Sequence, residues 1–424
     1  MKKILIITYY WPPKAGVGVQ RWLKLTKYLV KHNCRPIIYT PDGGVSPLLD
    51  ESLINYIPHG LEVIKRKIFE PQKILHFFTR KRPSSDILVE KKSSFFGQIL
   101  IWLRANFFIP DSRSTWIKPS VRFLNRYLEK NPIDIVLSTG PPHSMHMIGL
   151  ALKKTHKIKW IADFRDPWTN IEYFDKLPLL SNKRIQHEKK EKEVVGNADL
   201  ILTVSNSWAD GFKKIGAKKT FILPNGYDSD DYNYTISKNK LFEFKIGHFG
   251  LYNELRDHAF FWKTLQKISR NVSDFDDNLK LLFAGEVHKN FFKQMKSLEL
   301  HSKLHHYPYL NHDKTIKNMM ECDLLLLTQA DTKAVLGRIP AKLFEYIGAR
   351  KPILAIGKKD SDLEKIISKI SYAWFVDFDN EKLLYDSVLE IYNMRTHTHQ
   401  FNDDISDFSR ENQAVNFINL INTL

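Results

Sequence analysis

The sequence predicts an α/β protein built from two Rossmann-like domains, each with a doubly wound parallel sheet, that face a cleft. Three observations predict this class. Short apolar runs rich in β-branched residues alternate with longer helical segments along almost the whole chain. The runs are continuously apolar, which is typical of strands buried on both faces. A polar stretch interrupts the alternation once, and a length of 424 residues suits two domains.

The first domain is predicted over residues 1–226. Its expected strands are KILIIT (3–8), PIIYT (36–40), DIVLST (134–139), KWIADF (159–164), DLILTVS (199–205) and TFILPN (220–225). Residues 227–242 are polar and have little periodicity, so we expect a linker there.

The second domain is predicted over residues 243–408. Its expected strands are FKIGHFG (244–250), LKLLFAG (279–285), LHHYPYL (304–310), CDLLLLTQ (322–329), KPILAIG (351–357) and YAWFVDF (372–378). Helices are expected between them, at 257–270, 289–299, 312–320, 339–349, 361–369 and 380–394. Residues 409–424 form a further helix candidate that can cross back to the first domain.

A formal net charge of +17 favours an anionic partner, such as a phosphorylated substrate, an anionic membrane or a nucleic acid. No module typical of nucleic-acid binding is recognisable, so we expect no nucleic acid. Two cysteines exclude a disulfide scaffold. The sequence lacks a signal-peptide pattern and a bilayer-spanning run, so we expect a cytoplasmic protein, either free or peripheral on the inner face of the cytoplasmic membrane.

Gly16 and Gly18 lie between the first strand and a helix expected to start near Val19. Small residues at this place let backbone N–H groups approach a ligand closely. The pattern is neither GxGxxG nor a P-loop, and a plain strand–helix turn is the alternative interpretation.

His143 follows the strand at 134–139 and is expected at the start of a helix, with His146 one turn further on. A histidine in this position can bind an anion or a hydroxyl, and the helix dipole lowers its pKa. Packing beneath a loop is the alternative, and it is stronger for His146.

Asp163, Arg165 and Asp166 end the strand at 159–164. Such a charged group either binds a polar substrate, such as the acceptor, or forms a structural ion-pair cluster. We expect Arg165 to pair with one of the two aspartates.

Pro340 suits the first position of a helix, whose free N–H groups can then bind phosphate. Arg338 and Lys342 place positive charge on either side of Pro340. Glu345 lies further along the helix and can accept hydrogen bonds from both hydroxyls of a ribose. An exposed helical charge is the alternative for Glu345.

These segments, in this order, resemble those of glycosyltransferase family 4, whose enzymes have the GT-B fold. The resemblance rests on YYWPPKAGVGVQR, STGPPHSMH, ADFRDPW, LPNGYD and GRIPAKLFEYIGARKPILA. It implies an N-terminal domain that binds the acceptor and a C-terminal domain that binds a sugar nucleotide. It also implies transfer of the sugar with retention at the anomeric carbon.

The resemblance further implies residue roles. Gly16 and Gly18 would form the loop that approaches the donor phosphates, and His143 would lie near the transferred sugar. Arg256 and Lys342 stand where the family has its two diphosphate-binding cations.

Glu345 matches the second glutamate of the family's E-x7-E motif, which binds the nucleotide ribose. Gly337 stands where the first glutamate is expected, so the contact to the donor sugar differs in this chain. Arg338 can substitute for either diphosphate-binding cation.

Acidic D-x-D triplets can hold a metal ion beside a diphosphate, and the chain has three of them. We interpret all three as solvated turns and expect no metal cofactor: Asp228/Asp230, Asp274/Asp276 and Asp377/Asp379.

The predicted function is therefore retaining transfer of a sugar from a nucleotide-sugar donor to a saccharide or lipid-linked acceptor, in the synthesis of surface polysaccharide or glycoconjugate. A sugar-nucleotide 2-epimerase of the same architecture and a basic nucleic-acid-binding protein are the alternatives. The apolar stretch from Phe95 to Phe108 follows basic clusters at 80–82 and 91–92. It predicts either a core helix or a helix that binds an anionic membrane surface.

Overall fold

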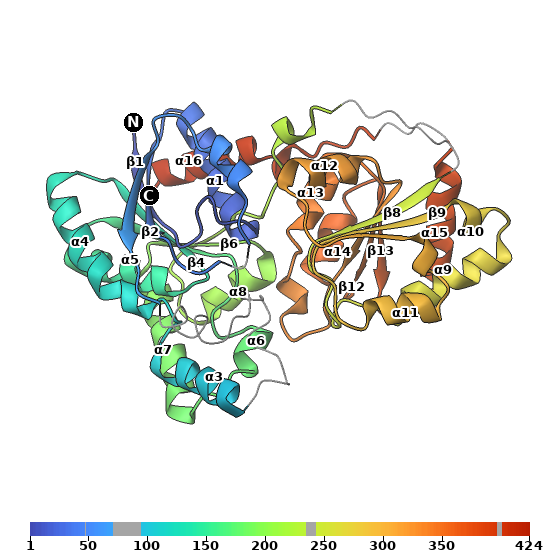
Figure 1. Cartoon of the computed structure of the whole chain (residues 1–424). Helices are drawn as coiled ribbons and strands as arrows, with labels where there is room; N and C mark the ends of the chain where they lie inside the picture. The colour runs from blue at the N-terminus through green and yellow to red at the C-terminus, as the bar shows by residue number, and fades with distance from the viewer. Residues whose placement is uncertain (47, 71–94, 235–242, 397–400) are drawn as a thin grey trace. The chain divides into compact units, whose positions relative to one another are not determined.

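The computed structural model describes residues 1–424 except 47, 71–94, 235–242 and 397–400 (Figure 1). It divides into two compact units. Unit 1 comprises Met1–Pro224 and Gln413–Leu424, and unit 2 comprises Asn225–Asn412. In the described parts of both units, every pair of neighbouring strands in the two sheets is parallel, which confirms the predicted α/β class.

The sheet of unit 1 has the strand order β3-β2-β1-β4-β5-β6-β7. The strands are β1 (Lys3–Ile7), β2 (Arg35–Asp42), β3 (Glu62–Lys67), β4 (Ile135–Gly140), β5 (Lys159–Phe164), β6 (Leu200–Thr203) and β7 (Thr220–Ile222). The α-helices are α1 (Val17–Lys31), α3 (Phe95–Phe107), α4 (Ile117–Lys130), α5 (Ser144–Thr155), α6 (Glu172–Asp175), α7 (Ser181–Asn197), α8 (Asn206–Lys214) and α16 (Arg410–Asn422).

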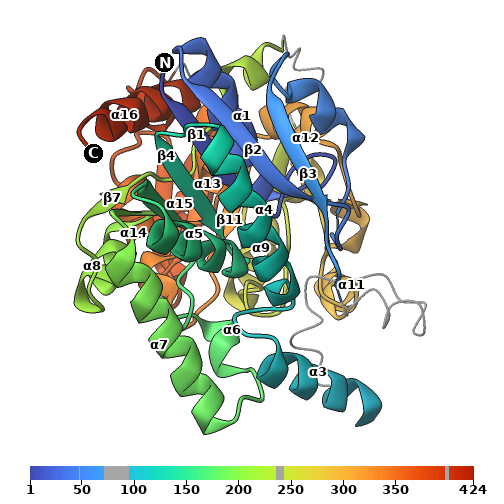
Figure 2. The same ribbon diagram turned by 90° about the vertical axis from the view of Figure 1, so that its left-hand side faces the viewer.

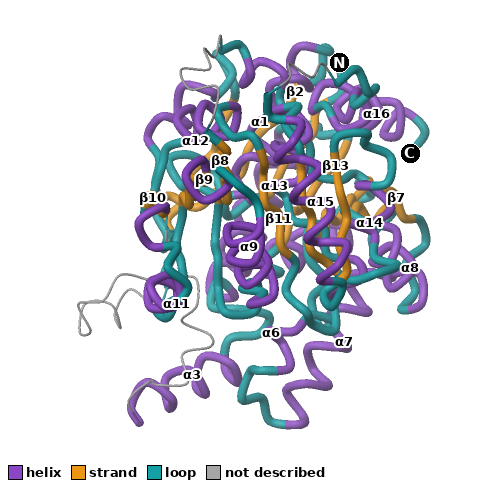
Figure 3. Tube along the Cα trace, turned by 90° about the vertical axis from the view of Figure 1, so that its right-hand side faces the viewer, coloured by secondary structure: helices purple, strands orange, loops and turns teal. Residues whose placement is uncertain are grey.

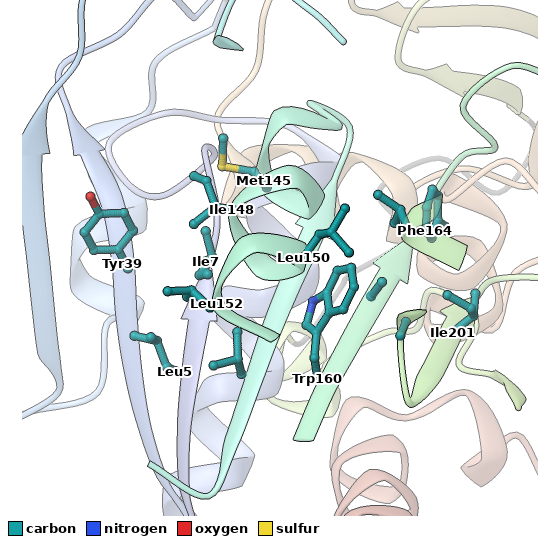
Figure 4. Close-up of a cluster of buried hydrophobic side chains, with 14 of the residues drawn as sticks. Leu5, Ile7, Tyr39, Met145, Ile148, Leu150, Leu152, Trp160, Phe164 and Ile201 are labelled. Carbon is teal, nitrogen blue, oxygen red and sulfur yellow. The ribbon is translucent and has the colours of Figure 1, made fainter. Parts of the chain in front are cut away.

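Helices cover both faces of this sheet (Figure 2). Successive side chains of a strand point to opposite faces, so Leu5 and Ile7 of β1 enter one core cluster, whereas Ile4 and Ile6 enter another. The first cluster packs β1, β4 and β5 against α5, where Trp160 is fully buried (Figure 4). The continuously apolar strand sequences are explained by this double burial.

The sheet of unit 2 has the strand order β10-β9-β8-β11-β12-β13. The strands are β8 (Phe244–Phe249), β9 (Leu279–Ala284), β10 (Leu304–Tyr307), β11 (Leu324–Thr328), β12 (Ile353–Gly357) and β13 (Ala373–Asp377). The α-helices are α9 (Ala259–Asn271), α10 (Phe275–Asn278), α11 (Phe291–Ser297), α12 (His312–Met320), α13 (Lys342–Ala349), α14 (Asp362–Ile367) and α15 (Glu381–Met394).

Two core clusters again lie on opposite faces of the sheet. One includes side chains of α9, α11 and α15, which Figure 3 shows on the near face, and the other includes side chains of α12, α13 and α14. In both units the strand order reverses next to the first strand, between β1 and β4 in unit 1 and between β8 and β11 in unit 2. Ligands of doubly wound sheets bind at such reversal points, beyond the carboxyl ends of the strands.

The expected linker at 227–242 is wrong for its first half. Residues 229–232 form a short 3-10 helix that belongs to unit 2. The hydroxyl of Tyr232 donates to the carbonyl of Glu345 at 2.8 Å, and Asp231 pairs with His312 at 2.8 Å. The polar sequence therefore packs against α12 and α13. The second half of the predicted linker, 235–242, lies outside the described residues.

The helix at the C-terminal end of the chain packs into unit 1. Ala414, Phe417 and Ile421 of α16 are buried in the cluster that contains α1, and Phe417 meets Trp22 edge to face with ring centroids 5.8 Å apart. Unit 1 is thus completed by chain that follows unit 2.

Candidate functional site

The first predicted site segment lies at the reversal point of unit 1. Gly16 is the N-cap residue of α1 and has φ 108°, a conformation that favours glycine. The helix begins at Val17 rather than near Val19, so Gly18 lies in its first turn. A Cβ atom on Gly18 would come within 2.1 Å of a guanidinium nitrogen of Arg165. Gly18 is therefore small because Arg165 packs against it.

Asp163 is fully buried and lies at the centre of a structural cluster of hydrogen bonds. Its carboxylate accepts two hydrogen bonds from Arg21 (2.9 and 3.2 Å), one from Trp22 Nε1 (2.7 Å) and one from Thr139 (2.8 Å). Burial alone would raise the pKa of Asp163, but Arg21 and these hydrogen bonds lower it below its usual range. Asp163 therefore serves to join β5 to α1 and β4.

We expected Arg165 to pair with Asp163 or Asp166, and the ion-pair partner of Asp163 is Arg21. Arg165 instead donates to the backbone carbonyls of Gly140 and Pro141. Burial lowers the pKa of Arg165, and the charges of Asp163 and of half-buried Asp166 oppose that shift. Arg165 thereby fixes the loop between β4 and α5.

His143 is the N-cap residue of α5, as expected, and its side chain is only 6% exposed. Its ring stacks on Trp168 with centroids 5.0 Å apart and an angle of 2° between the planes. Among the described residues, neither ring nitrogen has a hydrogen-bond partner. Burial, followed by the neighbouring His146 and Arg165, holds the pKa of His143 well below its usual range, so the imidazole is neutral at pH 7.

His146 is a core residue, in agreement with the alternative interpretation. Its Nδ1 lies 2.9 Å from the hydroxyl of Ser138, and its ring stacks on Phe164 at 4.2 Å. Burial lowers its pKa to about 3. The structure therefore separates the two histidines: both are buried, and His146 has a hydrogen-bonded ring nitrogen whereas His143 has none.

The second half of the predicted site lies at the reversal point of unit 2. α13 begins at Lys342, so Pro340 precedes the helix rather than opening it. Lys342 Nζ and Glu345 Oε2 form an ion pair at 2.5 Å, and both side chains are largely buried. The interpretation of Glu345 as an exposed charge is therefore wrong.

The loop before α13 contains Gly337 and Arg338 and is held by a side chain that sequence reasoning missed. Gln329, at the end of β11, donates to the carbonyls of Arg338 (2.6 Å) and Val335 (3.3 Å). Its side-chain oxygen Oε1 accepts a hydrogen bond from the backbone amide of Lys358, which follows β12, at 3.1 Å. A glutamine directly after the apolar run of β11 was the available signal.

The loop that follows β8 approaches α13 at Gly250. Gly250 has φ 124°, and a Cβ atom there would lie 4.0 Å from the side chain of Lys342. Arg256 in the same loop donates to the carbonyl of Leu251 at 3.0 Å. His248, at the end of β8, has a pKa of about 4, mainly because it is buried; the charges of Arg256 and Lys342 lower the pKa further. Both predicted cations thus act on one buried imidazole.

Asp257 holds this loop in place and was also missed. It accepts hydrogen bonds from Trp262 Nε1 (2.7 Å) and Tyr252 (3.2 Å) and contacts His288 Nε2 at 2.8 Å. Burial would raise the pKa of Asp257, but these bonds, above all that from His288, lower it. Asp257, the residue that follows Arg256, therefore has a structural role in this loop.

The interpretation of the acidic triplets as solvated turns is wrong in part, because Asp276 lies in α10, Asp377 ends β13 and Asp228 is buried. Asp228 caps residues 229–232 by accepting from the amide of Asp230 at 3.3 Å. Asp276 pairs with Lys303 at 2.7 Å, and Asp377 accepts from the amide of Phe378 at 2.9 Å.

Solved structures of similar fold cover the whole chain. Sucrose-phosphate synthase from Thermosynechococcus elongatus has a TM-score of 0.63 and 11% identity, over 100% of this chain and 99% of that chain. An E. coli structure described as trehalose-6-phosphate bound with UDP-2-fluoro glucose has a TM-score of 0.61 and 10% identity, over 100% and 99%. A putative UDP-N-acetylglucosamine 2-epimerase from Listeria monocytogenes has a TM-score of 0.58 and 11% identity, over 100% and 96%.

No curated protein matches the sequence. The family model described as Glycosyltransferase Family 4 matches residues 75–231, which include the segments around His143 and Asp163. Residues 75–231 are thus similar to glycosyltransferase family 4, and the whole chain shares its two-domain α/β fold with these solved structures.

Proposed function

We propose that this protein is a glycosyltransferase, which moves a sugar from a nucleotide-sugar donor to a saccharide or lipid-linked acceptor, with retention at the anomeric carbon, in the synthesis of surface polysaccharide or glycoconjugate. The observation that carries the proposal is that Lys342, at the start of α13, lies beside Gly250 in the loop that also contains Arg256, at the reversal point of the unit 2 sheet. A nucleotide diphosphate bound there would meet two cations.

The proposed chemistry follows from charge. When the bond between the sugar and the diphosphate breaks, negative charge develops on the leaving diphosphate. Two cations held in place stabilise that charge without reorganising. Glu345 keeps Lys342 in position through Oε2, and no described residue donates a hydrogen bond to its Oε1. We assign Oε1 to the ribose hydroxyls of the donor.

The remaining predicted residues complete the proposal. His143 would contact the transferred sugar, since a sugar hydroxyl would satisfy a ring nitrogen that is otherwise unpaired. Gly16 has open space where a Cβ atom would stand, which supports a close approach to the donor phosphates. Gly337 removes the carboxylate that family members use on the donor sugar, so Gly337 and Arg338 would make a different contact there.

The two cations supply the charge that a metal ion would otherwise provide, so we expect transfer without a metal cofactor. Addition of EDTA should change the rate by less than about twofold. A loss of more than about tenfold that Mg²⁺ or Mn²⁺ reverses would contradict this expectation.

A panel of nucleotide sugars tests the donor assignment. The matching donor should be hydrolysed slowly without acceptor and should stabilise the protein, by about 2.7 kcal/mol at one hundred times its dissociation constant. If no nucleotide sugar is hydrolysed or stabilises the protein, the proposal is wrong.

The similarity to a putative UDP-N-acetylglucosamine 2-epimerase makes epimerisation the second candidate. Incubation with donor alone separates the two functions. A 2-epimerase interconverts two nucleotide sugars, whereas a glycosyltransferase releases the nucleotide. Salt-dependent binding of DNA with unchanged affinity for nucleotide sugars would instead favour the nucleic-acid alternative.

An anionic membrane surface is the further partner that we propose. Four apolar side chains of α3 are exposed: Ile99 (38%), Trp102 (37%), Leu103 (38%) and Phe107 (67%). No helix among the described residues is long and apolar enough to cross a bilayer. The basic clusters at 80–82 and 91–92 and the side chains of Phe95 and Phe96 lie outside what the structure describes.

A further inference from the structure

Two buried polar side chains of α7 hold the aromatic ring on which His143 rests. The buried side chains of this helix are His187, Glu191, Val194 and Val195. The valines pack into the hydrophobic core. His187 and Glu191 are four residues apart, so they lie on one face of α7, and both contact the loop that follows β5.

His187 binds the side chain of Trp168. Indole Nε1 donates to His187 Nδ1 at 3.0 Å. An indole N–H can only donate, so Nδ1 of His187 must accept and carries no proton. Burial lowers the pKa of His187 to about 4, so at neutral pH the ring is uncharged, with its proton on Nε2. This bond fixes the rotation of the Trp168 ring about its side-chain bonds.

Glu191 binds the backbone of the same loop. Its carboxylate accepts from the amides of Trp168 (3.0 Å) and Thr169 (3.2 Å) and from the hydroxyl of Thr169. Burial raises the pKa of Glu191, and these donors oppose that shift. Trp168 is therefore held at its side chain by His187 and at its backbone by Glu191.

The ring of Trp168 in turn sets the plane of His143. The two rings are parallel within 2°. On another side of the imidazole, a Cβ atom on Gly140 would come within 3.2 Å of Nδ1, so the backbone of β4 limits movement there. With no hydrogen bond from a described residue to either ring nitrogen, packing alone orients His143.

We propose that His187 and Glu191 are positioning residues, which act through Trp168 to hold the His143 imidazole for the sugar. The role in turnover rests on the proposed function, whereas the effect on the orientation of His143 does not. A merely structural role would affect only the stability of the loop.

Substitutions separate these two roles. His187→Leu removes the acceptor for Trp168, and His187→Asn returns an oxygen near the position of Nδ1. We expect His187→Leu to lower kcat about tenfold with KM for the donor changed less than twofold, which is the pattern of a lost transition-state contact. His187→Asn should recover kcat to within about threefold of the wild type, and Glu191→Gln should behave like His187→Leu.

Val194→Ala is the matched control, because it removes buried volume from the same face of α7 without touching the loop. It should lower the melting temperature and leave kcat unchanged. If His187→Leu and Glu191→Gln also lose only thermal stability and keep the wild-type kcat, the proposal is overturned.

A second measurement does not depend on activity. Diethyl pyrocarbonate modifies imidazole nitrogens, and mass spectrometry of the peptide that contains His143 reports the rate. We expect modification at least threefold faster in His187→Leu and Glu191→Gln than in the wild type or Val194→Ala. If the wild type transfers no sugar, the proposed function fails, and this rate alone decides the positioning role; equal rates in all four proteins overturn it.

Discussion

Substitution of His143 distinguishes a role in catalysis from a role in packing, because the first predicts lost turnover and the second lost stability. His143→Ala should lower turnover about tenfold or more, equivalent to about 1.4 kcal/mol of lost transition-state stabilisation, with little change in nucleotide affinity. The measurement is kcat together with the dissociation constant of the nucleoside diphosphate.

His146→Asn is the control for His143→Ala, since an amide can replace the contact of His146 with Ser138. It should cost stability and spare turnover. A His143→Ala protein that melts early but turns over normally when folded would assign His143 to packing as well.

The ion pair at the start of α13 gives a second residue-scale prediction. Glu345→Ala should weaken binding of the nucleoside diphosphate about tenfold, because the ribose contact and the hold on Lys342 are both lost. Lys342→Ala should mainly slow transfer, because it removes charge stabilisation of the leaving group. Isothermal titration and initial rates measure the two effects.

Glu381→Ala and Lys382→Ala, at exposed positions in the first turn of α15, are charge-matched controls and should change neither quantity. If affinity for the bare nucleoside diphosphate is unchanged in both α13 variants, the donor site is not at α13.

At the scale of residues, the sequence placed His143 at a helix start and Lys342 and Glu345 on one helix, but it did not reveal the partners of Asp163 and Trp168. Helix starts and strand ends are local features, so a single sequence reveals them. The partner of Asp163 is Arg21, 142 positions earlier, and the clamp on Trp168 comes from another helix. Contacts of this kind depend on how elements pack, which no local pattern encodes.

Helix α3 exposes apolar side chains, which is the basis for the proposed binding to an anionic membrane surface. We expect the protein to sediment with liposomes that contain anionic lipid, and added salt should weaken this binding. Making Trp102 and Phe107 polar should release the protein because both side chains are exposed on α3. Liposome co-sedimentation at low and high salt is the measurement.

Tyr307→Ser is the control, since this aromatic side chain is exposed on β10 of unit 2. Wild-type protein that stays in the supernatant with anionic liposomes at low salt would contradict membrane docking.

Strands that are buried on both faces were predictable from their continuous apolar runs. β3 has no such run and was not predicted. β3 (Glu62–Lys67) is an edge strand whose last residues are the exposed Lys65, Arg66 and Lys67. β3 forms because its backbone pairs with β2, although its sequence has no continuous apolar run. α13 was expected from 339 but begins at Lys342, because the loop before it is fixed by Gln329 from a neighbouring strand.

The stability of the whole molecule should depend on pH, and three buried histidines of unit 1 should contribute to this dependence. His143, His146 and His187 have pKa values held below the unfolded value of about 6.5. Their neutral folded forms contribute stability above pH 6.5, which is lost as the pH falls and the unfolded chain takes up protons. Between pH 7 and 5.5 each imidazole should cost about 1 kcal/mol.

Urea unfolding at the two pH values measures this loss. Unit 1 should lose about 2–4 kcal/mol, with Glu191 opposing in part because its pKa is raised. His146→Asn should reduce the loss by about 1 kcal/mol. An unfolding free energy of unit 1 that is the same at pH 7 and 5.5 would contradict the neutral state of these histidines.

The place of α16 in unit 1 has a consequence for synthesis on the ribosome. Unit 1 is translated first, yet the helix that covers Trp22 emerges only after unit 2. At 5–20 residues per second, the intervening roughly 190 residues delay it by about 10–40 s. During that time the nascent chain carries an uncovered apolar face beside α1, a surface that chaperones recognise. The speed of translation through unit 2 therefore sets the time during which unit 1 lacks α16.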